Sequence, residues 1–289
     1  MAKTAPDPKV DFNRLRSCPQ VAWPTVILFV ACVTVIGGVW YAAIVHHFPL
    51  WAGALINGVA AYYLFSVVHD SSHNSLSRYK PLNELLGRIG LVYFAPLAPM
   101  DVARFIHMSH HRFTNDPERD PDSFAHRMDI WWPLRWTNFD YFYLRWFLLR
   151  GGDFARRKYP AIAAYAAFIL AASATITWLG YGRELFWLWL VATRVNSVLF
   201  VIVFIFLPHH PFETTAKEDE YKATALRMGG EWLLTPLMAF HNYHLIHHLY
   251  PSAPFYNYIK IMRLKEQEIL AREPLMPPPF GLAAQARGH

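Results

Sequence analysis

Long uninterrupted runs of apolar residues alternate with polar segments along this chain. Four of the runs are about 20 residues long, the length that crosses a bilayer at about 1.5 Å of rise per residue. They cover residues 24–45, 50–68, 160–182 and 185–207. The first three contain no charged residue, whereas the fourth contains Arg194 and Asn196. The pattern predicts an all-α integral membrane protein whose four transmembrane helices form two hairpins.

Three further segments show weaker patterns. The apolar run 85–100 is shorter, carries Arg88 and ends among prolines, so we expect it to lie at the interface or re-enter rather than span. Residues 131–149 mix aromatic with charged side chains, as helices at the headgroup level do. Residues 256–272 predict an amphipathic helix that packs against the membrane or the cytoplasmic part of the chain.

Composition supports the membrane assignment. Hydrophobic residues make up 54% of the 289 positions and charged residues 17%, whereas soluble chains average about 25% charged. The two cysteines, Cys18 and Cys32, are too few for a four-cysteine zinc site or iron–sulfur cluster. No nucleic-acid partner is expected.

The distribution of positive charge predicts the orientation. All but two of the 27 Lys and Arg residues fall on one side of the four predicted spans. The positive-inside rule therefore places both termini and the segments 69–159 and 209–270 in the cytoplasm. We expect the membrane itself to be a bacterial inner membrane. Residues 1–270 form one predicted domain, and the proline-rich residues 271–289 are expected to be a loose tail.

Histidines form three closely spaced clusters, all on the predicted cytoplasmic side. The first follows the pattern H-x-x-x-H and the other two follow H-x-x-H-H. Their members, with one further histidine directly after the fourth span, are His69 and His73; His107, His110 and His111; His244, His247 and His248; and His209.

This spacing favours metal binding. Residues three and four apart share one face of a helix, so each cluster presents two or three imidazoles together, and imidazole is a common ligand of transition metals. Nine imidazoles exceed what one tetrahedral zinc uses and suffice for two ions with open positions. The chain has no Glu-x-x-His motif, so imidazole is expected to dominate the ligand set. We expect no catalytic side chain beyond these ligands.

Several polar residues near the clusters are candidates for supporting roles. Metal-bound imidazoles usually donate their second N–H to a carboxylate or carbonyl. The candidates for this role are Asp70, Asn115, Asp116, Asp120, Asp122 and Asn242. The Asp-Pro pairs among them are equally typical of turns. His241 is expected to serve as a hydrogen-bonding residue. Arg194 and Asn196, within a span, either line a substrate tunnel or hold helices together.

The order of the three clusters on four spans resembles the integral-membrane fatty acid desaturase and hydroxylase superfamily. The flanking sequences HHRFTNDPE (110–118), LPHHPF (207–212) and NYHLIHHLYP (242–251) are similar to its bacterial β-carotene hydroxylase branch. The resemblance covers about residues 60–260. The chain departs from that branch at His210, where Arg is expected, and this favours His209 as the ninth ligand.

The resemblance implies a non-haem di-iron centre that activates O₂ and oxidises an unactivated C–H bond of a membrane lipid. The product is an alkene or an alcohol, and the substrate is a fatty acyl chain or a carotenoid ring. Electrons must come from outside, because the chain has no G-x-G-x-x-G or P-loop motif. The implied partner is a ferredoxin or cytochrome-type donor with its reductase.

Two other classes of protein are alternatives. A metal transporter usually binds its ion near the bilayer midplane on broken helices, whereas these clusters follow the ends of predicted spans. A haem-binding electron carrier would usually place paired axial histidines within its spans, and the four predicted spans contain no histidine.

Overall fold

The computed structural model describes residues 8–282, and this part of the chain is helical, with two isolated bridges and no β-strand. The predicted all-helical class is therefore confirmed. In chain order, the elements are α1 (Pro8–Leu15), α2 (Trp23–His46), α3 (Leu50–Ser72), α4 (Lys80–Phe94), α5 (Met100–Phe113), η1 (Pro121–Ala125), α6 (Trp132–Thr137), α7 (Phe139–Arg150), α8 (Gly152–Ile176), η2 (Thr177–Tyr181), α9 (Gly182–Leu185), η3 (Phe186–Val191), α10 (Ala192–Phe200), η4 (Val201–Phe206), α11 (Leu207–His209), α12 (Glu231–Leu237), η5 (His241–Tyr243), α13 (His244–Leu249), η6 (Phe255–Asn257) and α14 (Tyr258–Leu270).

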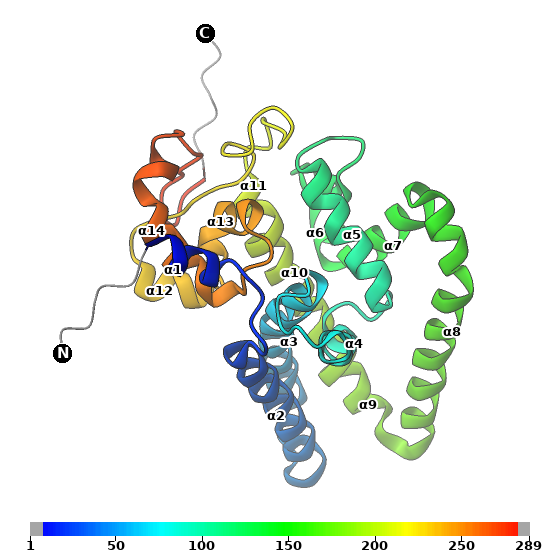
Figure 1. Ribbon diagram of the computed structural model, residues 1–289. Helices are drawn as coiled ribbons and strands as arrows, with labels where there is room; N and C mark the ends of the chain where they lie inside the picture. The colour runs from blue at the N-terminus through cyan, green and yellow to red at the C-terminus, as the bar shows by residue number, and fades with distance from the viewer. Residues whose placement is uncertain (1–7, 283–289) are drawn as a thin grey trace, which may run out of the picture.

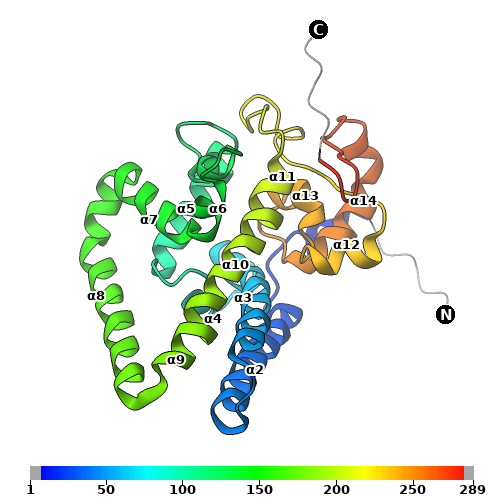
Figure 2. The same cartoon turned by 180° about the vertical axis from the view of Figure 1, so that it is seen from behind.

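Three helical stretches of the described chain are long and apolar enough to cross a membrane: Trp23–His46, Leu50–Ser72 and Gly152–His209. The third has 58 residues and contains both the predicted third and fourth spans. It is not straight, because Gly180 adopts φ 95°, a left-handed conformation that glycine tolerates. Figures 1 and 2 show α8 running one way and α9 and α10 running back at an angle to it, so this stretch has two arms.

Helix α3 lies at the centre of the fold, because small residues on it and on α4 allow close packing. A Cβ added at Gly58 would lie 2.6 Å from Val195 on α10, and one added at Gly90 of α4 would lie 2.9 Å from Val68 on α3. Helix α2 covers α3 from the outside and keeps most of its surface exposed. This arrangement holds the C-terminal end of α3, with the first histidine cluster, inside the molecule.

We expect Gly58→Ala to destabilise the protein, because the new methyl group would overlap Val195 and crowd the Ala192 carbonyl. Overpacking of this kind costs about 1–3 kcal/mol. Gly37→Ala in α2 is the matched control, since nothing lies within 4 Å of its Cβ position. Thermal unfolding in detergent should show a lower midpoint for Gly58→Ala than for Gly37→Ala. Equal midpoints would contradict the close approach of α3 and α10.

The weaker sequence patterns have different outcomes. Helix α4 covers most of the segment 85–100 and is not among the three stretches able to span, as predicted. The segment 131–149 is helical, in two pieces rather than one: α6 and α7 are separated at Asn138, whose φ of −126° is not helical. Helix α14 forms as predicted and packs Ile261 and Met262 against Leu245 of α13.

The C-terminal tail continues from α14 along the surface of the part of the molecule that contains α13. The backbone N–H of Leu226 donates to Leu275 O at 2.9 Å, and Leu275 N–H donates to Tyr221 O at 3.2 Å. The predicted loose tail is thus hydrogen-bonded at Leu275, while its last residues, 283–289, lie outside the described residues.

Candidate metal centre

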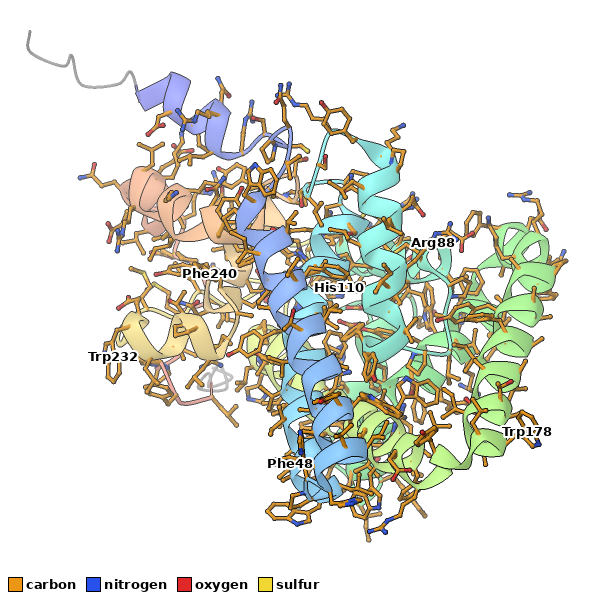
Figure 3. The ribbon with its side chains drawn as sticks, turned by 90° about the horizontal axis from the view of Figure 1, so that it is seen from below. Phe48, Arg88, His110, Trp178, Trp232 and Phe240 are labelled. Atoms are coloured by element: carbon orange, nitrogen blue, oxygen red, sulfur yellow. The ribbon has the colours of Figure 1, made fainter. Side chains whose placement is uncertain are left out.

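The nine predicted histidines come from four separate elements that meet at one place. The first cluster ends α3, the second lies on the C-terminal half of α5, His209 is the last residue of α11, and the third cluster forms most of α13. Figure 3 labels His110 near the middle of the molecule, whereas Trp178 and Trp232 lie at its edges. Residues far apart in the sequence are therefore brought together around the interior.

The nine side chains divide into two groups. In each group one ring nitrogen per histidine lies within 4.8 Å of the corresponding nitrogen of every other member. Group A consists of His69, His73, His107, His111 and His247, and group B consists of His110, His209, His244 and His248. The second and third clusters both contribute to the two groups. His107 and His111 belong to group A and His110 to group B, whereas His247 belongs to group A and its two neighbours in α13 to group B.

In group A the Nε2 atoms point at one another. His247 Nε2 lies 3.0 Å from His69 Nε2 and 2.8 Å from His111 Nε2. The Nε2 atoms of His73 and His107 are 2.8 Å apart. His247 therefore connects the end of α3 with α5.

Group B has the same character. His244 Nε2 lies 3.0 Å from His209 Nε2 and 3.1 Å from His248 Nε2. Two nitrogens bound at right angles to one metal, at about 2.1 Å each, would be about 3.0 Å apart. The observed separations in both groups fit this spacing, and an all-imidazole set suits iron, copper, zinc or nickel.

The protonation states of His107, His111 and His248 also fit a metal site. Burial lowers the pKa of His107, His111 and His248 well below its usual value, and the neighbouring imidazoles lower it further. These rings are therefore neutral at neutral pH, the form that binds metal. For His110, burial is opposed by the nearby Asp122 and Asp120 carboxylates, and its pKa is raised to about 9.

Polar side chains hold the imidazoles of His110 and His247 by their second nitrogen. His110 Nδ1 lies 3.0 Å from Asp120 Oδ1 and 3.2 Å from Asp122 Oδ2. His247 Nδ1 lies 3.0 Å from the hydroxyl oxygen of Tyr258 on α14. Partners of this kind fix the ring orientation of a metal ligand.

The other proposed supporting residues differ in position. Asp70 is buried and its carboxylate lies 3.6 Å from His69 Nδ1, although its hydrogen bonds are to Thr25 and the Phe255 N–H. Asp116 instead forms an ion pair with Arg119 near the surface.

The side chains of Asn115 and Asn242 form hydrogen bonds to backbone carbonyls rather than to histidine rings. The Asn115 side chain donates to the carbonyls of Thr214 and Ala223, both at 2.8 Å, and Asn242 donates to Arg227 O at 3.3 Å. Among the described residues, neither side chain forms a hydrogen bond to a histidine. They fix the loops around the site.

Tyr258 is the contact that sequence reasoning missed. It follows His247 by eleven residues, on a different helix, and no local spacing links the two. His241 lies beside both groups, donates from Nδ1 to Ala239 O at 3.0 Å and leaves its buried Nε2 without a hydrogen-bond partner in the described structure.

A narrow apolar cavity of about 40 Å³ adjoins group A. Its walls include His69 and His107, together with side chains from α3, α4, α5 and α10, such as Phe65, Leu91, Phe94, Ala103, Ile106 and Phe200. Three polar side chains also line it, but Ser72 and Tyr143 donate to Val68 O and Asp122. The third, Asp140, forms an ion pair with Arg194, so the cavity presents hydrocarbon and imidazole to a ligand.

Arg194 and Asn196 hold helices together and are not among the residues that line this cavity. Arg194 makes a two-pronged ion pair with the buried Asp140, with its Nη2 at 2.7 Å from Asp140 Oδ2, and so fastens α10 to α7. Asn196 donates to Phe94 O at 2.9 Å and links α10 to the end of α4. Both therefore hold residues that line the cavity, Asp140 and Phe94, in place.

Fold and site together describe a membrane protein built around a multi-histidine centre beside an apolar cavity. The family model for fatty acid desaturase matches residues 46–277, and the chain belongs to this family. The predicted membership of the membrane desaturase and hydroxylase superfamily is therefore confirmed, and the chain is an enzyme of the desaturase or oxygenase type.

Individual relatives fall into two groups by substrate. The sn-1 oleoyl-lipid 12-desaturase of Picosynechococcus sp. is 26% identical over 274 residues, which is 83% of this chain and 75% of that protein. A 12-desaturase of the same description from Anabaena variabilis is 27% identical over 281 residues, 86% of this chain and 77% of that protein. The beta-carotene ketolase of Paracoccus sp. (strain PC1) is 29% identical over 199 residues, 67% of this chain and 71% of that protein.

Proposed function

We propose that this protein uses O₂ and two iron ions to oxidise an unactivated C–H bond in a membrane lipid. The observation that carries this proposal is the position of group A beside the apolar cavity, with group B directly next to it. A metal transporter would need a polar path to its ion, whereas this cavity is lined mostly by apolar side chains.

The residues of groups A and B would hold one iron ion each. Iron bound there supplies the chemistry that activates O₂ and removes hydrogen from a saturated carbon. In support of this, the buried Nδ1 atoms of His69 and His244 have no hydrogen-bond partner in the described structure and their Nε2 atoms face other imidazoles. Neither ring is thus occupied as an ordinary structural histidine.

The chain's own contribution is to bind and orient the substrate and to exclude water. Phe65, Phe94 and Phe200 form an apolar wall that favours a hydrocarbon over water. His69 and His107 border the same cavity, so the oxidised carbon would lie against group A. Because a shift of about 1 Å changes which C–H bond is within reach, the cavity shape would decide between desaturation and hydroxylation.

The proposed orientation has four crossings and places the histidines at the cytoplasmic face of a bacterial inner membrane. The two arms of Gly152–His209 support this count, since at about 1.5 Å per residue each is long enough for one crossing. The distribution of Lys and Arg supports the direction. The proposed electron source is a ferredoxin or cytochrome-type donor with its reductase.

Expression in a host that makes both β-carotene and ordinary fatty acyl lipids tests the function. We expect an oxidised product in one of the two pools, and the pool identifies the substrate as carotenoid ring or acyl chain. In Ala103→Leu, a larger side chain fills the cavity one helical turn before His107, so we expect roughly tenfold less product with unchanged iron content. No product in either pool from iron-loaded protein would refute the proposal.

A further inference from the structure

Arg227 is almost completely buried, at 1% exposure, yet no carboxylate pairs with it in the described part of the chain. Its guanidinium instead donates to three carbonyls. Nη1 lies 2.8 Å from Pro278 O and 2.5 Å from Gly281 O, both in the tail, and Nη2 lies 2.9 Å from Leu207 O. A buried cation is costly unless its donors are satisfied. The buried Nε of Arg227 has no hydrogen-bond partner in the described structure, so the three acceptors at Nη1 and Nη2 determine where the side chain lies.

Leu207 begins α11, the short helix that ends at His209. The backbone before Arg227 holds the same helix, because Ala225 N–H donates to Pro208 O at 2.6 Å. Ala223 O accepts from His209 Nδ1 at 3.4 Å. The segment 223–227 therefore fixes both the backbone and the ring of one group B histidine.

The same segment is tied to the tail on its other side. Ala225 and Leu275 form a parallel bridge, and Leu226 N–H donates to Leu275 O at 2.9 Å. A surface hollow of about 290 Å³ has His209 on one side and the tail residues Glu273–Met276 on another. We call residues 275–281 the strap, since they run past His209 and end on Arg227.

We propose that Arg227 and the strap position His209 and thereby control whether group B retains its metal ion. Among the described residues, group A meets this segment through the backbone of α13, where Leu245 N–H donates to Ala225 O at 3.3 Å, and none of its rings is hydrogen-bonded to the segment or the strap. Its members come from α3, α5 and α13, and its α13 member is held by Tyr258 of α14, which precedes the strap. Arg227 acts through His209 and is a positioning residue. The inference depends on the proposed function only in that both groups bind metal.

Two truncations test this inference. Deletion of 275–289 removes the strap and its three contacts with Arg227 and Leu226, whereas deletion of 283–289 leaves every described contact and is the matched control. We expect wild type and control to retain two iron ions per chain after exposure to a chelator, and the strap deletion to retain one. Removing a residue that supports a metal ligand typically lowers metal affinity by roughly 10- to 100-fold.

Two background variants and two substitutions of Arg227 show which group loses its iron. In a His248→Ala background, which already lacks a group B ligand, deletion of the strap should remove no additional iron. In a His73→Ala background, which lacks a group A ligand, it should remove the remaining iron. Arg227→Met should behave like the strap deletion, and Arg227→Lys, which keeps a donor for the carbonyls, should restore part of the retention.

Asn115→Ala provides a second route if the strap deletion does not fold, because the Asn115 side chain donates to the same Ala223 O that accepts from His209 Nδ1. It too should release only one iron ion. Folded variants that keep two iron ions, or that lose both together, would overturn the inference. A wild-type protein that binds no iron would instead refute the proposed function.

Discussion

Replacing His247 with alanine is expected to abolish product formation and to lower the iron content from two ions per chain to one. His247 is the shared neighbour in group A, with its Nε2 at 3.0 Å from that of His69 and 2.8 Å from that of His111. Removal of this ring takes away the contact between α3, α5 and α13 at the metal. Loss of a residue that only supports a metal ligand typically lowers metal affinity or activity by roughly 10- to 100-fold. Loss of the ligand itself should therefore reduce activity by at least about 100-fold.

His210→Ala is the matched control for this variant. His210 follows His209 directly but belongs to neither group, and its ring lies against Phe206 and Phe212. We expect it to keep two iron ions and most of its activity. If His247→Ala were to keep both ions, or if His210→Ala were to lose one, the division into groups A and B would be wrong.

Asp120→Asn is expected to have the second-largest effect. The Asp120 carboxylate is fully buried and accepts from His110 Nδ1 at 3.0 Å, Asn115 N–H at 2.7 Å and Asp122 N–H at 2.9 Å. Loss of its negative charge makes His110 a weaker ligand, and an amide in place of one oxygen cannot accept all three bonds. We expect roughly 10- to 100-fold weaker iron binding at group B and a lower unfolding temperature.

Asp116→Asn tests the same change four residues earlier, at a carboxylate that pairs with Arg119 near the surface. Surface ion pairs are worth about 0–1 kcal/mol, so this variant should keep wild-type iron affinity. Chelator competition measured on the two variants side by side distinguishes them. Equal affinities would show that the contact between Asp120 and His110 does not support the metal.

The sequence was most informative where one helix carries the whole signal. A spacing of four places His107 and His111 on one face of α5, and the same rule applies to His244 and His248 on α13. The apolar run that becomes α2 can likewise be identified from its own length and composition, without knowing which helices pack against it. These features are local, and the structure contains them much as predicted.

Features that depend on contacts between distant helices could not be predicted. The ion pair of Arg194 with Asp140 joins residues 54 positions apart, and sequence alone left open whether Arg194 lines a tunnel or packs. Tyr258 reaches His247 only because α14 folds back on α13. The division of the nine histidines between groups A and B also follows from tertiary structure, since α5 contributes to both.

Elemental analysis of the purified, detergent-solubilised protein after reconstitution with ferrous iron tests the central claim most directly. If each histidine group holds one ion, about two iron ions should be retained per chain, falling to about one in His247→Ala and remaining at two in His210→Ala. Retention of no iron by the folded wild-type chain would contradict the assignment of these imidazoles as a di-iron centre.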